Sequence, residues 1–326
     1  MGEISRHSDL LDKLMNGVSA LSRSDKWSEY LDYQSRFRDY SFSNVLLIAL
    51  QRPGATRVAG YKAWEKLGRR VSRGEKAIYI RAPILHRRAL SDDAGTESSE
   101  LSVRGFRYVP VFDVAQTEGD AVPSVCENLS SSDPRDAYDR LLVVASQLGY
   151  RVEYAELPGR TNGDCSFDLR RIRIRTENSP AQHVKTLAHE IGHAMLHEET
   201  RDRRLAELEA ESIAYVVCAA LGLDSGRYSF GYVTIWSGGG AEAIDQIKSS
   251  CHRIQQAAGE ILSSMPVSAA AHARVGGRSE RARSSVDLYA VDEKWDLDLC
   301  PRVTVAVATD ELTGREWGST VRTGAL

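Results

Sequence analysis

The feature that most constrains this chain is the motif His189-Glu190-x-x-His193. On a helix, residues four apart share one face with their Cβ atoms about 6 Å apart, so both imidazoles can bind one tetrahedral metal ion. Glu190 follows His189 on the same helix and brings a carboxylate beside the open coordination position. Zinc lowers the pKa of a bound water to about 7, and the carboxylate can then accept the proton. The motif predicts a helical Zn²⁺ site with His189 and His193 as ligands and Glu190 as the catalytic base.

The residues before and within the motif favour a helix. Ser179 is a suitable N-cap, Pro180 fits the first helical position, and Gln182 completes a capping box. Gly192 costs roughly 1 kcal/mol in a helix interior, which indicates close packing or room for a substrate. An apolar stripe runs through the segment at helical spacing: Val184, Leu187, Ala188, Ile191 and Met195.

A catalytic zinc usually has three protein ligands, and a second predicted helix downstream offers Glu207, Glu209 and Glu211. Glu207 and Glu211 share one face, whereas Glu209 points nearly opposite. We expect Glu207 to be the ligand and Glu211 to orient a histidine, but spacing alone leaves all three open because Glu209 falls within the apolar arc. His197 lies about 12 Å along the helix from His189. We expect it to pack or to form hydrogen bonds and not to bind the same ion.

Composition is that of an ordinary water-soluble chain, with 326 residues, 42% of them hydrophobic and 27% charged. The longest apolar run, residues 213–221, is too short to cross a bilayer, and no apolar leader opens the sequence. The five cysteines are scattered and never form a CxxC pair, which argues against a disulfide framework or a cysteine zinc site. We expect a cytoplasmic protein with no membrane partner.

The pattern of elements predicts an α+β protein. Its first domain is expected to be mixed α/β and its second mainly helical with a small sheet. Within the first, we expect residues 87–105 to form an exposed loop between two strands. The expected division is a domain over 1–120, a linker over 121–133, a domain over 134–263, a flexible linker over 264–285 and a small β-rich tail over 286–326.

Charge is concentrated in residues 52–88, which hold eleven Lys and Arg residues against Glu65 and Glu75. Such asymmetry in a chain with a net charge of −3 indicates an anionic partner for this segment.

The N-terminal sequence from Trp27 to Pro83, continued by residues 111–119, resembles the N-terminal domain of the ArdC antirestriction proteins. The residues that carry this resemblance include Phe37-Arg-Asp-Tyr-Ser-Phe42, Asn44, Gln51-Arg-Pro53, Val58-Ala-Gly-Tyr61, Trp64, Leu67-Gly-Arg69 and Gly74-Glu-Lys76. Residues 189–193 and 207–215 resemble the zinc peptidase domain of ArdC and, more distantly, the ImmA/IrrE metallopeptidases. Glu211 stands where the ImmA/IrrE pattern has Asn. The resemblance implies a single-stranded-DNA-binding (ssDNA-binding) domain joined to a metallopeptidase-like domain.

Binding of ssDNA requires a positive groove with aromatic stacking platforms. The basic segment interleaves both residue types, although a solvated basic face with its aromatic rings in the core is the alternative for Tyr61 and Trp64. The expected ssDNA contacts are Arg57, Tyr61, Lys62, Trp64, Lys66, Arg69, Arg70, Arg73 and Lys76.

Three functions are compatible with these features. The first is a zinc peptidase of antirestriction type that binds ssDNA and hydrolyses a peptide bond in a DNA-associated protein substrate, with Tyr215 or Tyr232 stabilising the oxyanion. The second is a non-catalytic protector of incoming ssDNA with a structural metal site. The third is a regulatory protease that cleaves a repressor. Zinc is favoured by the motif, but a His₂Glu site can also take manganese.

Overall fold

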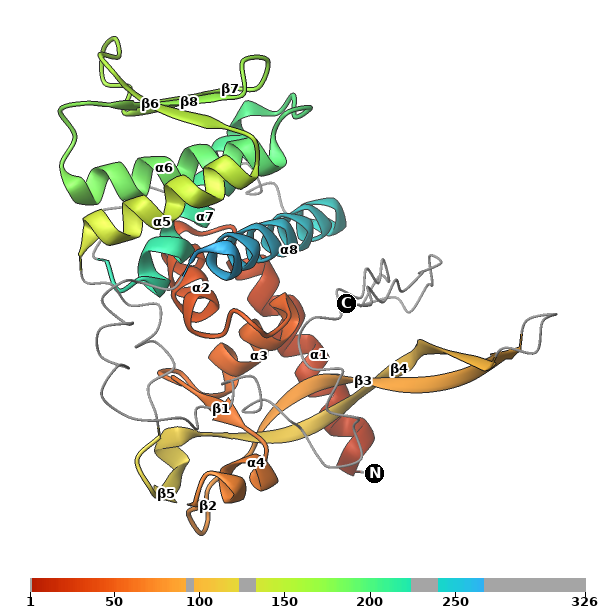
Figure 1. Ribbon diagram of the computed structural model, residues 1–326. Coiled ribbons are helices and arrows are strands. Elements are labelled where there is room, and N and C mark those ends of the chain that lie inside the picture. The colour runs from red at the N-terminus through yellow and green to blue at the C-terminus, as the bar shows by residue number, and fades with distance from the viewer. Residues whose placement is uncertain (1, 92–96, 123–132, 224–239, 267–326) are drawn as a thin grey trace. The chain divides into compact units, whose positions relative to one another are not determined.

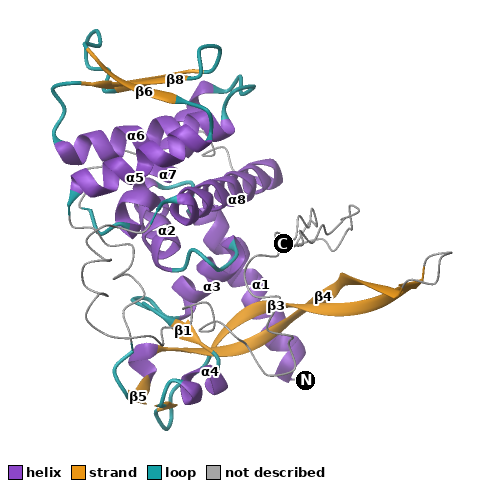
Figure 2. Cartoon of the chain, viewed as in Figure 1, coloured by secondary structure: helices purple, strands orange, loops and turns teal. Residues whose placement is uncertain are grey.

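The computed structural model describes residues 2–91, 97–122, 133–223 and 240–266, and Figures 1 and 2 trace its elements. The described residues divide into two compact units. Unit 1 contains residues 2–14, 47–91 and 97–122, and unit 2 contains residues 15–46, 133–223 and 240–266. The division differs from the expected domain over 1–120, because residues 15–46 pack with the second unit.

Unit 2 contains helix α2 (Ser24–Arg36), whose aromatic stripe is buried. Trp27 is 0% exposed, and its indole Nε1 donates a hydrogen bond to Ser212 Oγ at 3.0 Å. Long-range burial of this stripe is the reason that α2 joins unit 2. Helices α1 (Gly2–Ala20) and α3 (Phe42–Gln51) each cross the division between the units.

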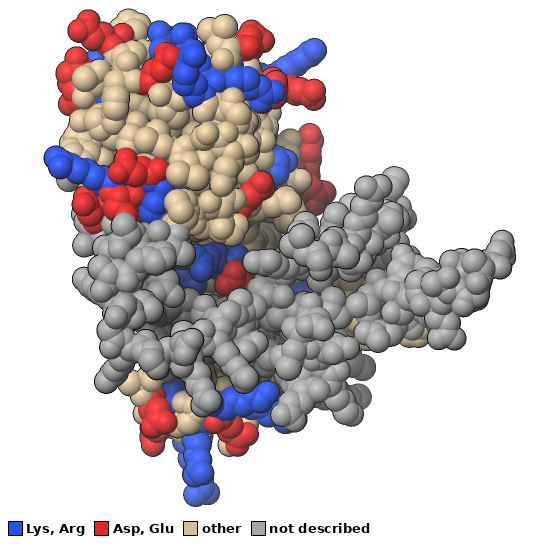
Figure 3. Space-filling view, viewed as in Figure 1, with Lys and Arg blue, Asp and Glu red and all other residues tan. Residues whose placement is uncertain are grey.

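A three-stranded sheet forms one layer of unit 2. Its strands are β6 (Arg151–Ala155), β7 (Gly163–Ser166) and β8 (Arg171–Arg175), in the order β6-β8-β7. β8 runs parallel to β6 and antiparallel to β7. Ile172 and Ile174 are fully buried between arginines that alternate with them, as the period of a strand requires. Figure 3 shows acidic and basic side chains mixed over this sheet.

Helices α5 (Pro134–Gln147) and α6 (Pro180–Leu196) cover the inner face of that sheet (Figure 1). The next layer is α7 (Arg203–Ala220), which packs against α6 on one side and against α2 and α8 (Gly240–Ser264) on the other. Ser179 and Asp202 cap α6 and α7 by accepting hydrogen bonds from backbone N–H groups of the first turn. These stacked layers place the motif helix α6 between the sheet and α7.

Unit 1 is built on a long antiparallel hairpin of β3 (Ile78–Ser91) and β4 (Glu97–Asp113). Pairing continues as far as Ser91 and Glu97, so the expected loop over residues 87–105 was wrong. Backbone groups form the ladder hydrogen bonds of a strand whatever its side chains are, so the polar composition of this stretch did not exclude strands. A register shift between Ile84 and Leu85 interrupts the pairing once.

Smaller elements complete unit 1. Strand β1 (Val58–Ala59) pairs with β4, and β2 (Arg69–Val71) pairs with β5 (Thr117–Gly119). Helix α4 (Tyr61–Lys66) and the 3₁₀ turn η1 (Val114–Gln116) join them. One hydrophobic cluster, formed partly by α4 itself, consists of Ala59, Ala63 and Trp64, with Leu67, Val71, Phe112, Val114 and Val122 packed around them.

The prediction of a mixed α and β fold is confirmed. No described helix is long and apolar enough to cross a membrane. No disulfide bond joins the described cysteines, Cys165, Cys218 and Cys251. The expected tail over 286–326 and most of the expected linkers lie outside the described residues.

Candidate metal centre

Side chains from α6 and α7 converge in a group suited to a metal ion. One donor atom each from His189, His193 and Glu207 lies within 4.8 Å of the other two. The Nε2 atoms of the two histidines are 3.1 Å apart, and Glu207 Oε2 is 3.5 Å from the first and 3.9 Å from the second. Among the described residues this is the group of three or more potential ligands that could hold an ion. Two imidazoles and one carboxylate match the donor set of a catalytic zinc site.

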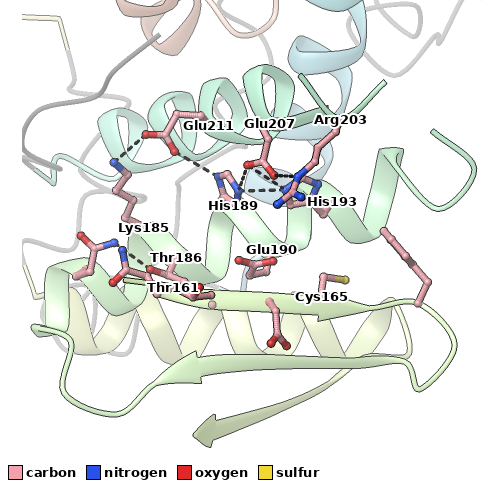
Figure 4. A pocket seen from close by; sticks show the side chains of 15 residues that line it. Thr161, Cys165, Lys185, Thr186, His189, Glu190, His193, Arg203, Glu207 and Glu211 are labelled. Atoms are coloured by element: carbon pink, nitrogen blue, oxygen red, sulfur yellow. Dashed lines mark hydrogen bonds and ion pairs between the residues drawn. The ribbon is translucent and has the colours of Figure 1, made fainter. Parts of the chain in front are cut away.

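The three donors line a pocket of about 600 Å³, shown in Figure 4. Glu190 lines the same pocket and is 5% exposed, with its carboxylate between α6 and the sheet. Other residues also line the pocket. The motif did not indicate them, because their positions in the sequence follow no recognisable spacing. These are Thr161, Asn162, Gly163, Asp164, Cys165, Phe167, Gln182, Lys185, Thr186 and Arg203.

Burial and neighbouring charges perturb the titration of the pocket in the cation-free protein. Burial raises the pKa of Glu190 to about 7, against the lowering effect of His189. Burial would lower the pKa of His189, but hydrogen bonds with Glu207 and Glu211 outweigh it and raise the value to about 9. The hydrogen bond with His189, followed by the proximity of His193, holds the pKa of Glu207 far below its usual range. A cation must therefore compete with a proton for these donors.

Glu211 lies behind His189 and not among the converging donors. Its Oε2 is 3.3 Å from His189 Nδ1, and its Oε1 is 2.9 Å from Lys185 Nζ. If His189 donates its Nδ1–H to this carboxylate, its neutral ring keeps a lone pair on Nε2, the atom that faces His193 and Glu207. Glu211 therefore contacts His189 at Nδ1, the ring nitrogen other than the one that faces His193 and Glu207.

Glu209, which the sequence left open as a third ligand, points away from the pocket. It is 2% exposed, and its Oε2 lies 3.2 Å from His197 Nε2. Arg253 of α8 forms an ion pair with the same carboxylate. His197 is also buried, and its Nδ1 is 2.9 Å from His193 Nδ1, so it forms hydrogen bonds as expected.

Two glycines permit close approaches at the site. A Cβ on Gly163 of β7 would lie 2.9 Å from Glu190 Oε1 and 3.0 Å from the carbonyl oxygen of Arg173. A Cβ on Gly192 would lie 3.3 Å from Ala210 Cα in the facing helix. Of the two expectations for Gly192, the structure therefore shows close helix packing.

Tyr215 is not at the pocket. Its hydroxyl donates a hydrogen bond to Asp32 of α2. The expectation that it stabilises an oxyanion was wrong, because its position on α7 directs the ring toward α2. Tyr232 lies outside the described residues.

The expected ssDNA contacts in unit 1 are partly exposed and partly committed to the fold. Trp64 is 0% exposed, and its Nε1 donates to the carbonyl oxygen of Phe112 at 2.9 Å. It has no free face for a base, so the expectation of stacking was wrong for this residue. Arg69 binds β5 through two hydrogen bonds to Thr117, each of 2.8 Å. Its guanidinium group is therefore used largely within the fold.

The other candidates remain accessible to different degrees. Tyr61 is 49% exposed, and Arg57 is half-buried. The exposed basic candidates are Lys62, Lys66, Arg70, Arg73 and Lys76. These residues lie on α4 and on the β2 region, close to one another in sequence. The structure thus retains a basic segment with one exposed aromatic ring.

Comparison with known proteins gives two family matches. Residues 8–112 match the family model for the N-terminal domain of anti-restriction factor ArdC. Residues 145–219 match the model for the IrrE N-terminal-like domain of the M78 peptidases, a metallopeptidase-like fold. The second match contains the converging histidines and Glu207.

Individual relatives are distant. An uncharacterized protein of Bacillus anthracis is 22% identical over 333 residues, which cover 87% of this chain and 55% of that protein. The chain thus spans about half the length of this relative. The metal-free crystal structure of the antirestriction ArdC protein from plasmid R388 has 21% identity and a TM-score of 0.45, covering 69% of this chain and 84% of its own. The Mn(II)-bound structure has 22% identity and a TM-score of 0.42, covering 69% and 87%.

Proposed function

We propose that this ArdC-like protein is a zinc-dependent peptidase of antirestriction type whose N-terminal region binds ssDNA. The observation that carries the peptidase proposal is the convergence of His189, His193 and Glu207 beside the buried carboxylate of Glu190. The proposed substrate is a DNA-associated protein, and the proposed location is the cytoplasm.

His189, His193 and Glu207 would hold a divalent cation, which when bound supplies positive charge that acidifies water and polarises a peptide carbonyl. Glu190 would take the proton of the attacking water and pass it to the departing amine. Glu211 would keep His189 in the tautomer that presents Nε2.

The central test is Glu190→Gln, which keeps the shape of the side chain and removes its basicity. We expect zinc binding to persist and peptide hydrolysis to fall by 10²–10⁴-fold, roughly the contribution of general acid–base catalysis. The assay incubates the full chain with zinc and a proteome-derived peptide mixture, and new termini are counted by mass spectrometry. Glu199→Gln, at an exposed position beyond α6, is the matched control and should cleave as the wild type does.

The two arms of that experiment separate the alternatives. Cleavage that is equal in Glu190→Gln and the wild type would refute the assigned mechanism. Zinc bound tightly by a wild type that cleaves no peptide would favour a non-catalytic protector with a structural metal. Replacement of zinc by manganese in the same assay determines which cation sustains turnover.

The ssDNA proposal depends on the exposed basic residues of unit 1. Reversal of charge at Arg70 and Arg73 together should weaken binding to a labelled single-stranded oligonucleotide. The slope of log affinity against log salt concentration should also become shallower, by the amount expected for about two lost phosphate contacts. Fluorescence anisotropy over a salt series measures both quantities. The control is reversal at Arg151, an exposed arginine of unit 2. Equal losses in the two variants, or none in either, would exclude this segment as the binding site.

A further inference from the structure

Behind His193 lies a line of buried polar side chains that the mechanism above does not use. His197 and Glu209 are 5% and 2% exposed. They connect His193 on α6 to Arg253 on α8, through contacts of 2.9 Å between the two histidine Nδ1 atoms and 3.2 Å between His197 Nε2 and Glu209 Oε2. We call His197, Glu209 and Arg253 the support chain.

The far end of the support chain is a fixed acceptor. Arg253 forms an ion pair with Glu209, with its Nε 3.1 Å from Oε1 and 3.2 Å from Oε2. Arginine can only donate, so it fills part of the acceptor capacity of the carboxylate and neutralises its charge in a buried place. Glu209 can then accept one more hydrogen bond, from His197 Nε2–H.

The direction of every other hydrogen bond follows from this acceptor. A neutral imidazole carries one proton, so a proton on His197 Nε2 leaves its Nδ1 as an acceptor. The group that faces this acceptor is His193 Nδ1, which must therefore carry the proton of its own ring. His193 Nε2 is then unprotonated, and this is the atom that lies near His189 and Glu207.

We propose that His197 is a positioning residue that, held by Glu209 and Arg253, fixes His193 in the tautomer able to bind the cation. The inference rests on the proposed metal site and goes beyond it, since neither the motif nor the family matches assign a role to these residues. His189 has its own support in Glu211 and Lys185. Each ligand histidine is thus oriented by a carboxylate that is paired with a cation, directly for His189 and through a second imidazole for His193.

The opposite direction is the competing arrangement. If His197 donated Nδ1–H to His193, then the proton of His193 would lie on Nε2 and would block the ligand atom. The arrangements differ in the tautomer of His197, which nitrogen NMR of the histidine rings reports in the cation-free full chain. Nε2–H on a neutral His197 is the expected result, and Nδ1–H would overturn the proposal. This measurement does not depend on whether the protein hydrolyses peptides.

The mutational test compares two replacements of His197. Gln offers an oxygen toward His193 and an N–H toward Glu209, so it can preserve the direction of the chain, whereas Leu can do neither. We expect His197→Leu to weaken Zn²⁺ affinity about 10–100-fold, measured by competition with a chelator, and His197→Gln to remain within about threefold of the wild type.

The matched control is His183→Leu, which removes another histidine of α6 that is in contact with a backbone carbonyl but does not line the pocket. It should lower thermal stability without changing Zn²⁺ affinity. Unchanged affinity in folded His197→Leu, or equal losses for Leu and Gln, would overturn the proposal. If His197→Leu does not fold, the tautomer measurement on the wild type still decides. If zinc affinities follow the expected pattern but the wild type hydrolyses no peptide, the result would count against the proposed peptidase function and leave the role of His197 standing.

Discussion

At the scale of single residues, the protonation state of each titratable side chain in the pocket depends on the charges of its neighbours. The carboxylates of Glu207 and Glu211 flank His189, whereas Glu190 is buried and favours its neutral form. A cation would take over the role that a proton on His189 has in the cation-free protein. Metal binding and proton release are therefore coupled here.

This coupling predicts how zinc affinity depends on pH. The cation-free pKa of His189 is raised to about 9, so at lower pH the cation must displace one proton. Affinity should rise about tenfold per pH unit between about pH 7 and 9 and then level off. Chelator competition across that range measures it. Glu211→Gln removes one of the carboxylates that raise this pKa, so levelling should occur at a lower pH, whereas Glu199→Gln should follow the wild type.

The same shift has a consequence for stability, and its sign is fixed by linkage. A folded pKa above the ordinary value of about 6.5 means that His189 stabilises the cation-free fold below that pH and loses this contribution as pH rises through about 9. The unfolding temperature of the cation-free protein should therefore fall over this window. Saturating zinc should remove the fall, and an unfolding temperature that rises with pH in the cation-free protein would contradict the assignment.

At the scale of elements, the site depends on the distance between α6 and α7, because the histidines lie on one helix and Glu207 on the other. Gly192 sets this distance. A Cβ there would meet Ala210 Cα at 3.3 Å and Ile213 Cδ1 at 3.2 Å, and the former contact is with backbone that cannot rotate away.

Two glycine substitutions should consequently have opposite effects. A Cβ at Gly259 of α8 would meet no atom of another element within 4 Å, so Gly259→Ala should gain up to about 1 kcal/mol from helix propensity. Gly192→Ala receives the same gain but must separate two packed helices, at a cost of about 1–3 kcal/mol for an overpacked core. Chemical denaturation measures both. A stabilised Gly192→Ala variant would show that the helices can move apart freely.

At the scale of the whole molecule, the chain alternates between the units: residues 2–14 belong to unit 1, residues 15–46 to unit 2, the described residues of 47–122 to unit 1, and those from 133 onward to unit 2. Residues 15–46 therefore belong to the unit that holds the metal centre, although they precede the basic segment in sequence. Besides the Trp27 contact with Ser212, Gln255 of α8 donates a hydrogen bond to the carbonyl oxygen of Arg38 at 3.3 Å. The unit cannot be complete without its N-terminal segment.

Trp27→Ala tests this organisation. Loss of a fully buried tryptophan and of its hydrogen bond to Ser212 should destabilise unit 2 by about 3–5 kcal/mol. A fragment of residues 134–263 should fail for the same reason, with low solubility and no cooperative unfolding. Leu169→Ala, at a position 61% exposed in the same unit, should change stability by no more than about 0.5 kcal/mol. Cooperative unfolding of the 134–263 fragment would show that α2 is dispensable.

The sequence by itself determined the features that depend on local spacing. Helical periodicity and the cap at Ser179 predicted α6. These features could be predicted because neighbouring residues define them. The motif likewise indicated His189, Glu190 and His193 as chemistry-bearing residues, since four-residue spacing on a helix is itself a geometric statement.

Only the tertiary structure decided which residues from distant segments meet. Glu207, Glu209 and Glu211 are alike in sequence, and the packing of α7 between α6 and α8 directs one toward the histidines, one toward His197 and Arg253, and one toward Lys185. In unit 1, packing between segments far apart in the chain likewise buries Trp64 in the core. Such outcomes depend on contacts between elements far apart in the chain, which no local pattern of residues encodes.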